Sequence, residues 1–500
     1  MTRENFPPRA DPPLAEKIPQ EVSAVLEKLQ SAGFEAHIVG GCVRDLLRGE
    51  KPKDWDVTTS AKPEEITKIF PDSFYENKFL TVTVKTEAKD ETLKEIEITT
   101  FRAEGKYTDK RHPDEIRFAK TLEEDLSRRD FTLNAIAVGV EGEIVDPFDG
   151  QGDLKKKLIR AAGDTEKRFE EDALRMMRAV RFAVELGLGI EEKTREAIEK
   201  LSGNMQFIAK ERIRDELVKI FAAPRAREGI GLLHDLGLLK YIIPEIEEGI
   251  GVENRPRIFT IWEHNLKALE YGAKQKFSWD VCLAALLHDV GKPRTKGPKK
   301  NDEWTFYGHD MVGARMAAQI LERLHFPRDT VEKVSTLIRW HLFKYDPNEG
   351  ITDSSIRRLV RHVGAENMDD LVRVRICDRM GMGVPKAVPY RLRHFQFRVE
   401  KILREEETPT PKMLKVNGED VMKILGIPQS IKVGHVLEVL LQEVIDDPTR
   451  NTKEKLELRI KNLGALSDEE LVKIADAAES KVEMVEDERI SEMKAKYYVK

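Results

Sequence analysis

The feature that most constrains the fold is the run from residue 36 to 59, where a short apolar stretch leads into two glycines and then a helical pattern. Ala36–Val39 has the composition of a strand, and Gly40-Gly41 follows it at once. A second strand-like run begins at Asp56, and others lie at Thr81–Val84 and Ile96–Thr100, with a helix expected at 63–70. An amphipathic helix is expected before them, at 21–33. This alternation predicts a small α+β unit that ends near residue 150.

The residue types at the glycine turn suit the binding of a phosphate chain. Two glycines between a strand and a helix let the backbone approach a phosphate closely, and a helix N-terminus attracts anions. Arg44, on the helix that follows, can clamp the same group through its guanidinium. We therefore expect Gly40, Gly41 and Arg44 to form part of a nucleotide-binding site.

Two aspartates follow the turn. Asp54 and Asp56 are two positions apart on a strand-like run, which places both carboxylates on one face. Hard oxygen ligands of this kind bind Mg²⁺, and two such ions can hold an in-line attack on an α-phosphate. Glu97, on a later strand, is a candidate third carboxylate. A glycine turn or an aspartate pair alone would be interpreted as a solvated loop, but their order within 20 residues favours a catalytic site.

Another polar constellation lies in the run EDALRMMRAVRF at 171–182. Asp172 and Arg175 are three apart and are expected to share a helix face, with Leu174, Met177 and Val184 packed in the core. A carboxylate accepts from an exocyclic amino group and a guanidinium donates to ring acceptors, which matches cytosine and adenine but not uracil or guanine. The pair would then select C and A without a nucleic-acid template. The alternative is a set of ordinary salt bridges on a solvated helix.

After the α+β unit the apolar period is helical, first from about 160 to 250 and then from Pro256 to about 405. The second block holds a set of histidines and aspartates: His264, His288, Asp289, His309, His341 and Asp378. Such ligands bind divalent transition metals such as Mn²⁺, Ni²⁺ or Fe²⁺ and generate hydroxide for phosphoester hydrolysis. Gly291 and Pro293 are expected to end the helix at the adjacent His288-Asp289. A lone histidine is more often a core residue, and His234-Asp235 is interpreted as that structural case.

Composition excludes several classes of protein. The chain has 500 residues, of which 40% are apolar, but no run of 18 apolar residues and no apolar N-terminal signal region. Cys42, Cys282 and Cys377 are widely spaced, which favours a reducing cytoplasm and argues against a structural zinc site. The net charge of −6 leans against a nucleic-acid binder, although a local basic stripe is sufficient for phosphate binding.

Several ordered motifs resemble one known family, the class II tRNA nucleotidyltransferases together with the bacterial poly(A) polymerases. They are GGCVRDLLRG followed by KDWDVTT, RRDFTLNAIAV at 128–138, DPFDG at 146–150, EDALRMMRAVRF at 171–182 and AKERIRDEL at 209–217. The resemblance covers about residues 25–250, and Cys42 and Leu133 are conservative departures from the motifs. The order of the histidines and aspartates further along resembles the HD phosphohydrolase signature.

The resemblance implies an α+β chain. It would have an N-terminal nucleotidyltransferase head, polymerase-β-like with a small mixed sheet and helices, followed by an all-helical neck and body and a helical HD domain. The implied division is a loose segment 1–22, the head 23–158, the neck and body 159–252, the HD domain 253–405, a C-terminal helical tRNA-binding unit 406–465 and a charged helical tail 466–500.

The resemblance also implies an activity, the addition of C, C and A from CTP and ATP to the 3′ end of tRNA with release of pyrophosphate. Asp54 and Asp56 would hold Mg²⁺, and Arg129, Asp172 and Arg175 match nucleotide-contacting positions. Arg178 and Arg181 extend the same basic face. The polar segment 102–117 corresponds to a flexible loop that helps the pocket switch from C to A; the alternative is a plain surface connection. The HD domain would hydrolyse phosphomonoesters or 2′,3′-cyclic phosphates, or would be a structural remnant.

Two other functions stay open. A poly(A) polymerase uses the same head but often carries a basic C-terminal extension, whereas the residues after 465 include ten acidic and six basic side chains. The other is an HD-type metal phosphohydrolase with an RNA-binding head. The expected partners are tRNA, CTP and ATP but no membrane, with the chain as a monomer or homodimer. Candidate RNA contacts are Lys210, Arg212 and Arg214, and a phosphate nest formed by Gly426, Pro428 and Gly434 before a helix.

Overall fold

The computed structural model describes residues 14–76, 81–103, 117–254, 259–300, 303–349, 351–384, 386–407, 414–467, 469–474 and 491–499. Its contacts divide the chain into two compact units. The first extends to Arg339 and also takes Met380–Gly383, and the second comprises Trp340–Arg379 and the chain from Val384 onward. Among the described residues, no helix is long and apolar enough to cross a membrane.

The head of the first unit contains a seven-stranded sheet in the order β3-β4-β5-β2-β1-β8-β9. The strands are β1 (Ala36–Val39), β2 (Asp56–Thr59), β3 (Ser73–Glu76), β4 (Thr81–Lys85), β5 (Glu95–Thr100), β8 (Ala137–Val138) and β9 (Ile144–Val145). β2 and β5 run parallel and the other neighbours run antiparallel. The sheet is therefore mixed, as predicted, and the strands expected from the sequence are present.

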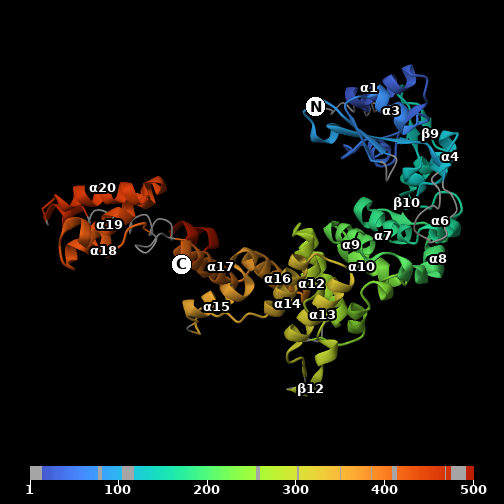
Figure 1. Ribbon diagram of the computed structural model, residues 1–500. Helices are drawn as coiled ribbons and strands as arrows, with labels where there is room; N and C mark the ends of the chain where they lie inside the picture. Colours follow the sequence, from blue (N-terminus) through green and yellow to red (C-terminus); the bar gives the residue numbers. More distant parts are fainter. Residues whose placement is uncertain are drawn as a thin grey trace, which may run out of the picture. The chain divides into compact units, whose positions relative to one another are not determined.

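The helices of the head are α1 (Gln20–Ser31), α2 (Gly41–Leu47), α3 (Pro63–Ile69), α4 (Leu122–Ser127) and α5 (Gly150–Lys156). α1 and α3 lie together against the sheet (Figure 1), because Val22 and Ile66 share one buried core with Ile98 of β5. A small ribbon of β6 (Arg102–Ala103) and β7 (Arg117–Phe118) brackets residues 104–116. The loop expected at 102–117 therefore lies almost entirely outside the described residues.

The neck helices follow: α6 (Thr165–Glu171), α7 (Leu174–Leu186), α8 (Glu192–Leu201), α9 (Lys210–Ala222) and α10 (Ala226–Asp235). This block is not helical throughout, because β10 (Leu158–Ile159) and β11 (Gly189–Ile190) form a short parallel pair. Gly187 caps the end of α7 with φ +68°, and the chain then extends beside β10.

The rest of the first unit contains α11 (Ile261–Lys274), α12 (Trp279–Leu287), α13 (His309–Arg323) and α14 (Arg328–Trp340). The end of α12 is as predicted, with His288 as its C-cap. A hairpin of β12 (Gly297–Lys300) and β13 (Glu303–Thr305) interrupts the helices and corrects the all-helical expectation. Pro298 is compatible with this extended pairing but not with a helix interior.

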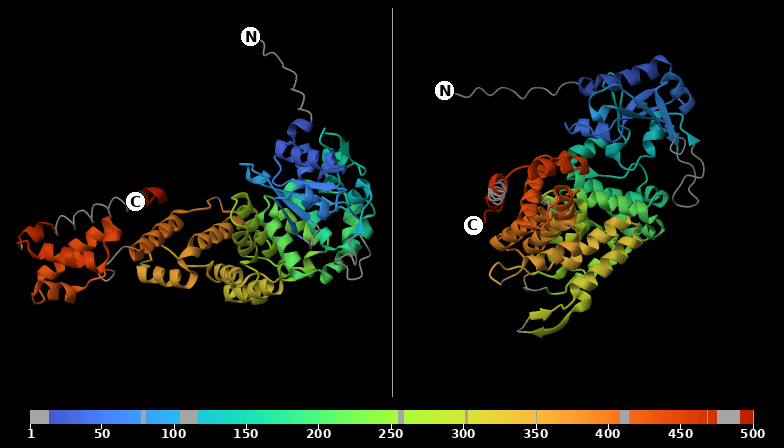
Figure 2. Two further views of the ribbon diagram at one scale, coloured as in Figure 1. Left: turned by 45° about the horizontal axis from the view of Figure 1, so that its top comes forward. Right: turned by 60° about the vertical axis from the view of Figure 1, so that its left-hand side comes forward.

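The second unit contains α15 (Asp353–Val363), α16 (Met368–Gly381) except its last two residues, α17 (Tyr390–Glu407), α18 (Gly418–Leu425), α19 (Ile431–Asp446) and α20 (Lys453–Gly464). Helices α18, α19 and α20 pack on one another around Val421, Val436 and Ile460 (Figures 1 and 2). In the described part of the tail expected to be helical, residues 469–474 and 491–497 form helices. Short 3₁₀ turns elsewhere in the chain span Leu14–Lys17, Glu91–Leu93, Thr132–Asn134, Ser202–Phe207, Leu239–Tyr241, Pro244–Gly249, Pro293–Thr295, Ala365–Asn367 and Pro448–Arg450.

Candidate active site

The glycine turn lies where β1 passes into α2. Gly40 has φ +81°, a conformation that side chains rarely adopt, and it is the N-cap of α2. A Cβ at this position would lie 3.1 Å from a guanidinium nitrogen of Arg129 and 3.3 Å from a carboxylate oxygen of Asp56. Glycine is therefore required here both for the backbone angle and for the close approach of these two side chains.

Asp54 and Asp56 flank Trp55 at the start of β2. Trp55 is 3% exposed and packs in the core of the head, while the two aspartates line one pocket. Asp54 precedes the strand, which begins at Asp56, so the expectation that both lie on the strand is wrong. The two aspartates still point the same way. Trp55 between them points into the core, and both aspartates line the pocket. In the parallel pairing of β2 and β5, Asp56 lies opposite Glu97.

The surroundings of Asp56 disfavour its ionised form. Burial and the neighbouring Asp54 carboxylate raise the pKa of Asp56 to about 6, and Arg129 works in the opposite direction. Glu97 contributes further negative charge to the same environment. A cation between the carboxylates would relieve this repulsion, and hard oxygen donors are the ligands that Mg²⁺ prefers. These residues therefore fit a magnesium ion.

The turn and the aspartates line a cavity of about 380 Å³ in the first unit. The full lining is Gly40, Gly41, Arg44, Asp54, Asp56, Arg128, Arg129, Asp130, Asn134, Arg175, Arg178 and Phe182. The cavity thus brings together three separate stretches of sequence: the turn with the aspartates, the run RRDFTLN, and the start of α7. Carboxylates and guanidiniums line the same cavity, an arrangement suited to a metal-bound triphosphate.

Two arginines of the head are fixed by hydrogen bonds at the edge of the cavity. Arg44 donates to Asp45 at 2.9 Å and to the amide oxygen of Asn134 at 3.1 Å. Arg129 lies 3.4 Å from the buried carboxylate of Asp125. Each guanidinium is thereby oriented in advance of any ligand.

Asp130 joins the head to α7. Its carboxylate forms an ion pair with Arg175 at 3.1 Å and another with Arg178. Burial disfavours its charge, but Arg178 and Arg175 outweigh that effect and hold the pKa of Asp130 below its usual value. Arg175 also pairs with Glu171 at 3.0 Å and is only 6% exposed. Its position is therefore fixed from both sides.

Asp172 does not lie on the same helix as Arg175. It ends α6 with extended backbone angles, and α7 begins at Leu174. Its carboxylate accepts a hydrogen bond from the backbone nitrogen of Leu174 at 3.1 Å and two from Arg212, at 3.2 and 2.7 Å. The prediction of a shared helix face is wrong. The Asp172 side chain accepts a hydrogen bond from the backbone N–H at the start of α7, and its extended backbone separates α6 from α7.

The remainder of α7 is a core helix. Leu174, Met177 and Val184 are buried, as predicted. Arg181 is 7% exposed; it pairs with Glu216 at 3.3 Å and its guanidinium lies 4.2 Å from the centroid of the Phe182 ring. Within the described residues it does not belong to the cavity lining. A phosphate contact from Arg181 stays a prediction.

A buried cluster of histidines and one aspartate lies in the first unit, on α11, at the end of α12 and at the start of α13. The ring Nε2 atoms of His264 and His288 are 2.9 Å apart, and Asp289 Oδ2 lies 3.3 and 3.4 Å from them. His309 Nε2 is 3.5 Å from the other oxygen of Asp289. Burial disfavours the charge of Asp289, but His288 and Lys292 hold its pKa well below the usual value. Imidazole nitrogens converging on a carboxylate fit a divalent transition metal.

The other residues of the HD-like pattern have different surroundings. His341 and Asp378 belong to the second unit, where they are 0% and 5% exposed, and Asp378 accepts a hydrogen bond from Arg375 at 2.8 Å. That they join the same metal set stays a prediction. His234 lies 2.6 Å from Glu247 and its ring packs against Trp262, in agreement with its structural interpretation.

The candidate RNA contacts are only partly available to a ligand. Arg212 is engaged by Asp172, and Arg214 donates to the backbone oxygen of His325 at 2.6 Å. Gly434 lies inside α19, which begins at Ile431, so its predicted place before a helix is wrong. Gly426 ends α18 with φ +66°.

Four lining residues were missed from the sequence: Arg128, Asp130, Asn134 and Phe182. The first three lie in RRDFTLN, where an acidic residue directly after two arginines was a usable signal. Phe182 gave none, because only the packing of α7 against the head brings its ring beside Arg44, whose guanidinium lies 5.6 Å from the ring centroid.

Comparison with family models gives three matches along the chain. Residues 36–160 match the Poly A polymerase head domain, 187–250 match the probable RNA and SrmB-binding site of polymerase A, and 261–380 match the HD domain. The families of the head and of the HD domain are metal-dependent.

Curated relatives and solved structures agree with these matches. The CCA-adding enzyme of Leuconostoc mesenteroides is 36% identical over 64% of this chain and 83% of its own length. That of Geobacillus kaustophilus is 32% identical over 87% of this chain and 95% of its own. The crystal structure of the Bacillus stearothermophilus CCA-adding enzyme in complex with CTP superposes with a TM-score of 0.53 and 27% identity, covering 91% of this chain and 98% of that one.

Proposed function

This chain belongs to the CCA-adding enzymes, and from that membership we propose that it adds C, C and A to the 3′ end of tRNA from CTP and ATP, without a nucleic-acid template. The observation that carries the proposal is the head cavity. In it, the glycine turn, Asp54 and Asp56 share one lining with Arg175 of α7. Phosphate-binding groups and Arg175, one of the two proposed base-selecting residues, thus line one cavity, while Asp172 is not among its lining residues.

The triphosphate is held by the head. The backbone at Gly40 and Gly41 approaches the phosphates, and Arg44, Arg129 and Arg178 provide the positive charge that neutralises them. Asp54 and Asp56, with Glu97 opposite, hold Mg²⁺, which supplies the charge that stabilises transfer at the α-phosphate. The 3′ oxygen of the RNA forms the new bond to the α-phosphorus as the bond to the β-phosphate breaks and pyrophosphate leaves.

Base selection is assigned to Asp172 and Arg175. Asp172 accepts from the amino group of cytosine or adenine, and Arg175 donates to the adjacent ring acceptors. Uracil and guanine present a carbonyl to the carboxylate, an acceptor against an acceptor, which costs on the order of 1–3 kcal/mol. Discrimination requires rigid partners. Asp130 and Glu171 fix Arg175, and Arg212 fixes Asp172, which supports this assignment.

The decisive assay uses the full-length protein, Mg²⁺ and a tRNA that lacks its CCA end, with each nucleoside triphosphate alone and with CTP and ATP together. We expect two C additions with CTP alone, a complete CCA end with CTP and ATP, and no further extension. UTP and GTP should not be incorporated. A long A tail from ATP alone would indicate a poly(A) polymerase, and no addition at all would refute the proposal.

The buried histidine cluster favours a second activity, the metal-dependent hydrolysis of phosphomonoesters or 2′,3′-cyclic phosphates at RNA ends. His264, His288, Asp289 and His309 would hold Mn²⁺, Ni²⁺ or Fe²⁺, which supplies a hydroxide at neutral pH. The test is phosphate release from a 2′,3′-cyclic phosphate end with each metal, after chelation of the purified protein. No release with any of these metals would leave the cluster as a structural remnant.

A cytoplasmic location stays a prediction from cysteine usage. Cys42, Cys282 and Cys377 are all free and buried.

A further inference from the structure

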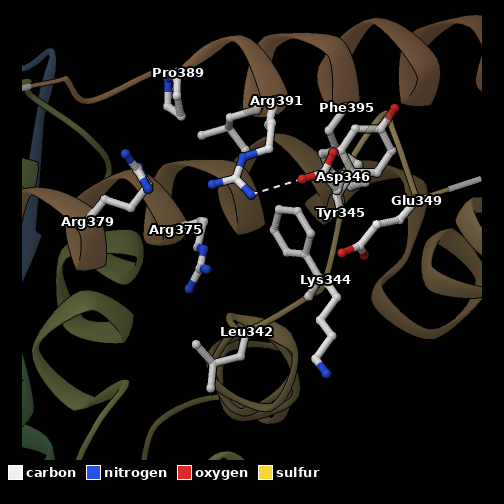
Figure 3. Close-up of a pocket in the computed structure, with 12 residues that line it drawn as sticks. Leu342, Lys344, Tyr345, Asp346, Glu349, Arg375, Arg379, Pro389, Arg391 and Phe395 are labelled. Atoms are coloured by element: carbon white, nitrogen blue, oxygen red, sulfur yellow. Dashed lines mark hydrogen bonds and ion pairs between the residues drawn. The ribbon is translucent and has the colours of Figure 1, made fainter. Parts of the chain in front are cut away.

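The second unit contains a cavity of its own, and none of its lining residues has been assigned above to a catalytic, nucleotide or metal site. It measures about 530 Å³ and lies between the segment 342–349, α16 and the start of α17. Binding sites for small ligands range over roughly 300–1,000 Å³, so the cavity has room for a nucleotide. Figure 3 shows the side chains that surround it.

The lining of the cavity is rich in positive charge. Lys344, Arg375, Arg379 and Arg391 supply four cations, against two acidic side chains, Asp346 and Glu349. Arg375, Arg379 and Arg391 approach the same hollow from α16 and α17 (Figure 3). Such a concentration of guanidiniums is unfavourable in a partly desolvated place unless an anion joins it.

Only part of this charge is neutralised by the protein. Arg391 pairs with Asp346 at 3.1 Å, an ion pair drawn in Figure 3, and Arg375 donates to Asp378 at 2.8 Å. Among the residues that the structure describes, Arg379 donates to one acceptor, the backbone oxygen of Lys386, at 3.3 Å. Its buried Nε has no hydrogen-bond partner among the residues that the structure describes. A donor of this kind, in a cavity wall, is a place for an oxyanion.

The N-terminal end of α17 adds to the positive potential in the cavity. Pro389, Arg391 and Leu392 belong to the lining, so the N-terminal end of this 18-residue helix borders the cavity. Its first turn contains no acidic residue that would neutralise the positive end of the helix dipole. Backbone and side chains of the lining therefore both favour an anion in this cavity.

An aromatic wall distinguishes the cavity from a simple ion site. Phe343 and Phe395 are stacked with their ring centroids 4.4 Å apart, and Tyr345 meets Phe395 edge to face at 5.1 Å. All three line the cavity. Aromatic rings beside a cationic cluster suit a ligand with a flat ring and a phosphate, because stacking is indifferent to the identity of the base.

From this combination we propose that the cavity is a second nucleotide-binding site, in which Arg375, Arg379 and Arg391 hold a phosphate and the half-buried rings of Phe343 and Tyr345, backed by the buried Phe395, contact the base. Both a free nucleoside monophosphate and a nucleotide within an RNA strand offer this chemistry. The site does not depend on the head cavity, so the proposal stands or falls separately from the assigned transferase reaction.

The test is photolabelling of the full-length protein with 8-azidoadenosine 5′-monophosphate, followed by mapping of the labelled peptides by mass spectrometry. We expect label in the peptide that contains Tyr345, reduced roughly tenfold by Arg379→Gln or Arg391→Gln, because each removes a charge-assisted phosphate contact. The matched control is Arg361→Gln, which removes a charge from an exposed position of the same unit and should keep the label. Thermal melting of each variant confirms that it is folded.

Competitors then identify the source of the nucleotide. Displacement of the probe by adenosine monophosphate alone indicates a terminal phosphate, and displacement by a short oligoribonucleotide without terminal phosphates indicates the RNA backbone; either supports the site. The proposed site would be overturned if Arg379→Gln and Arg391→Gln were labelled as strongly as the control. It would also be overturned if adenosine, which has no phosphate, displaced the probe as well as adenosine monophosphate does. An Asp54→Ala variant should retain this label, so a failure of the transferase assignment is distinguishable from a failure of this site.

Discussion

The head cavity and the histidine cluster are both built from polar side chains of the first unit, but they differ in their access to solvent. The cavity is open: Asp54 is exposed and the side chain of Arg178 is 33% exposed. In the cluster His264, His288 and Asp289 are at most 1% exposed. A triphosphate and an RNA end need an open polar pocket. A buried cluster of imidazoles and a carboxylate is organised for an ion, because only a tightly held ion repays such desolvation.

The two regions also distribute their acidic residues differently. In the head, Asp125 and Asp130 orient arginines, while Asp54 and Asp56 remain for a metal. In the cluster a single carboxylate, Asp289, approaches three histidines and also Lys292, 2.6 Å away. The head therefore separates the carboxylates that position other groups from those that take part in the reaction, and this separation can be tested by mutation.

The largest expected effect is a double dissociation of the two regions. Asp54→Ala should reduce nucleotide addition by about 10³-fold, or ~4 kcal/mol of transition-state stabilisation, because the metal loses a ligand. His288→Ala should abolish metal binding in the cluster and leave addition within about twofold. The measurements are primer extension and metal content by mass spectrometry. Asp72→Ala and His325→Ala, both exposed, are the matched controls. A loss of addition in His288→Ala would show that the two regions are coupled.

A smaller loss is expected from Asp130→Ala. Removing this carboxylate leaves Arg175 and Arg178 without their shared partner, and breaking a buried ion pair costs about 3–5 kcal/mol. We expect a lower melting temperature and roughly 10²-fold slower addition, since both arginines lose their orientation. Glu170→Ala, an exposed change on the neighbouring helix, is the control. If addition were unchanged while stability fell, Asp130 would have a structural role only.

Asp172→Ala should act on base choice more than on rate. The preference for CTP and ATP over UTP should fall by roughly tenfold or more, in line with the 1–3 kcal/mol typical of one base contact. The measurement is single-nucleotide incorporation with all four triphosphates. Arg212→Gln should relax selection to a lesser degree, because it removes only the group that fixes the carboxylate. Unchanged selectivity in both variants would remove the side-chain template.

The smallest expected effect is the proton balance of metal binding. The pKa of Asp56 is about 6 in the fold against an ordinary value of 3.8, so between these pH values the folded carboxyl keeps a proton that the unfolded chain has lost. The metal-free fold therefore loses stability as the pH rises through this window. Because Mg²⁺ favours the carboxylate, its binding at pH 6 should release about half a proton from Asp56. Calorimetry in buffers of different ionisation enthalpy measures this release. If Asp56→Asn released as many protons as the unchanged protein, the assignment of the proton to Asp56 would be contradicted.

The amino-acid sequence by itself determined the local chemistry. The glycine turn, the spacing of the two aspartates, and the strands and helices around them follow from short-range pattern, because backbone angle and side-chain alternation depend on neighbouring residues. The buried positions Leu174, Met177 and Val184 followed from helical period in the same way. The family motifs added the order in which these local units combine.

The tertiary structure alone decided which charges meet. Asp130 of the head contacts two arginines of α7 that lie more than forty residues further along, and Asp172 pairs with Arg212 of α9 instead of sharing a helix face with Arg175. A short-range pattern assigns an aspartate to a helix from its spacing. The energy that ends the helix comes from a capping bond and from a distant guanidinium, whose approach depends on the packing of α9 against α7. The cationic cavity of the second unit was likewise invisible in the sequence, because Arg391 of α17 and the aromatic residues join Arg375 and Arg379 of α16 only in the folded chain.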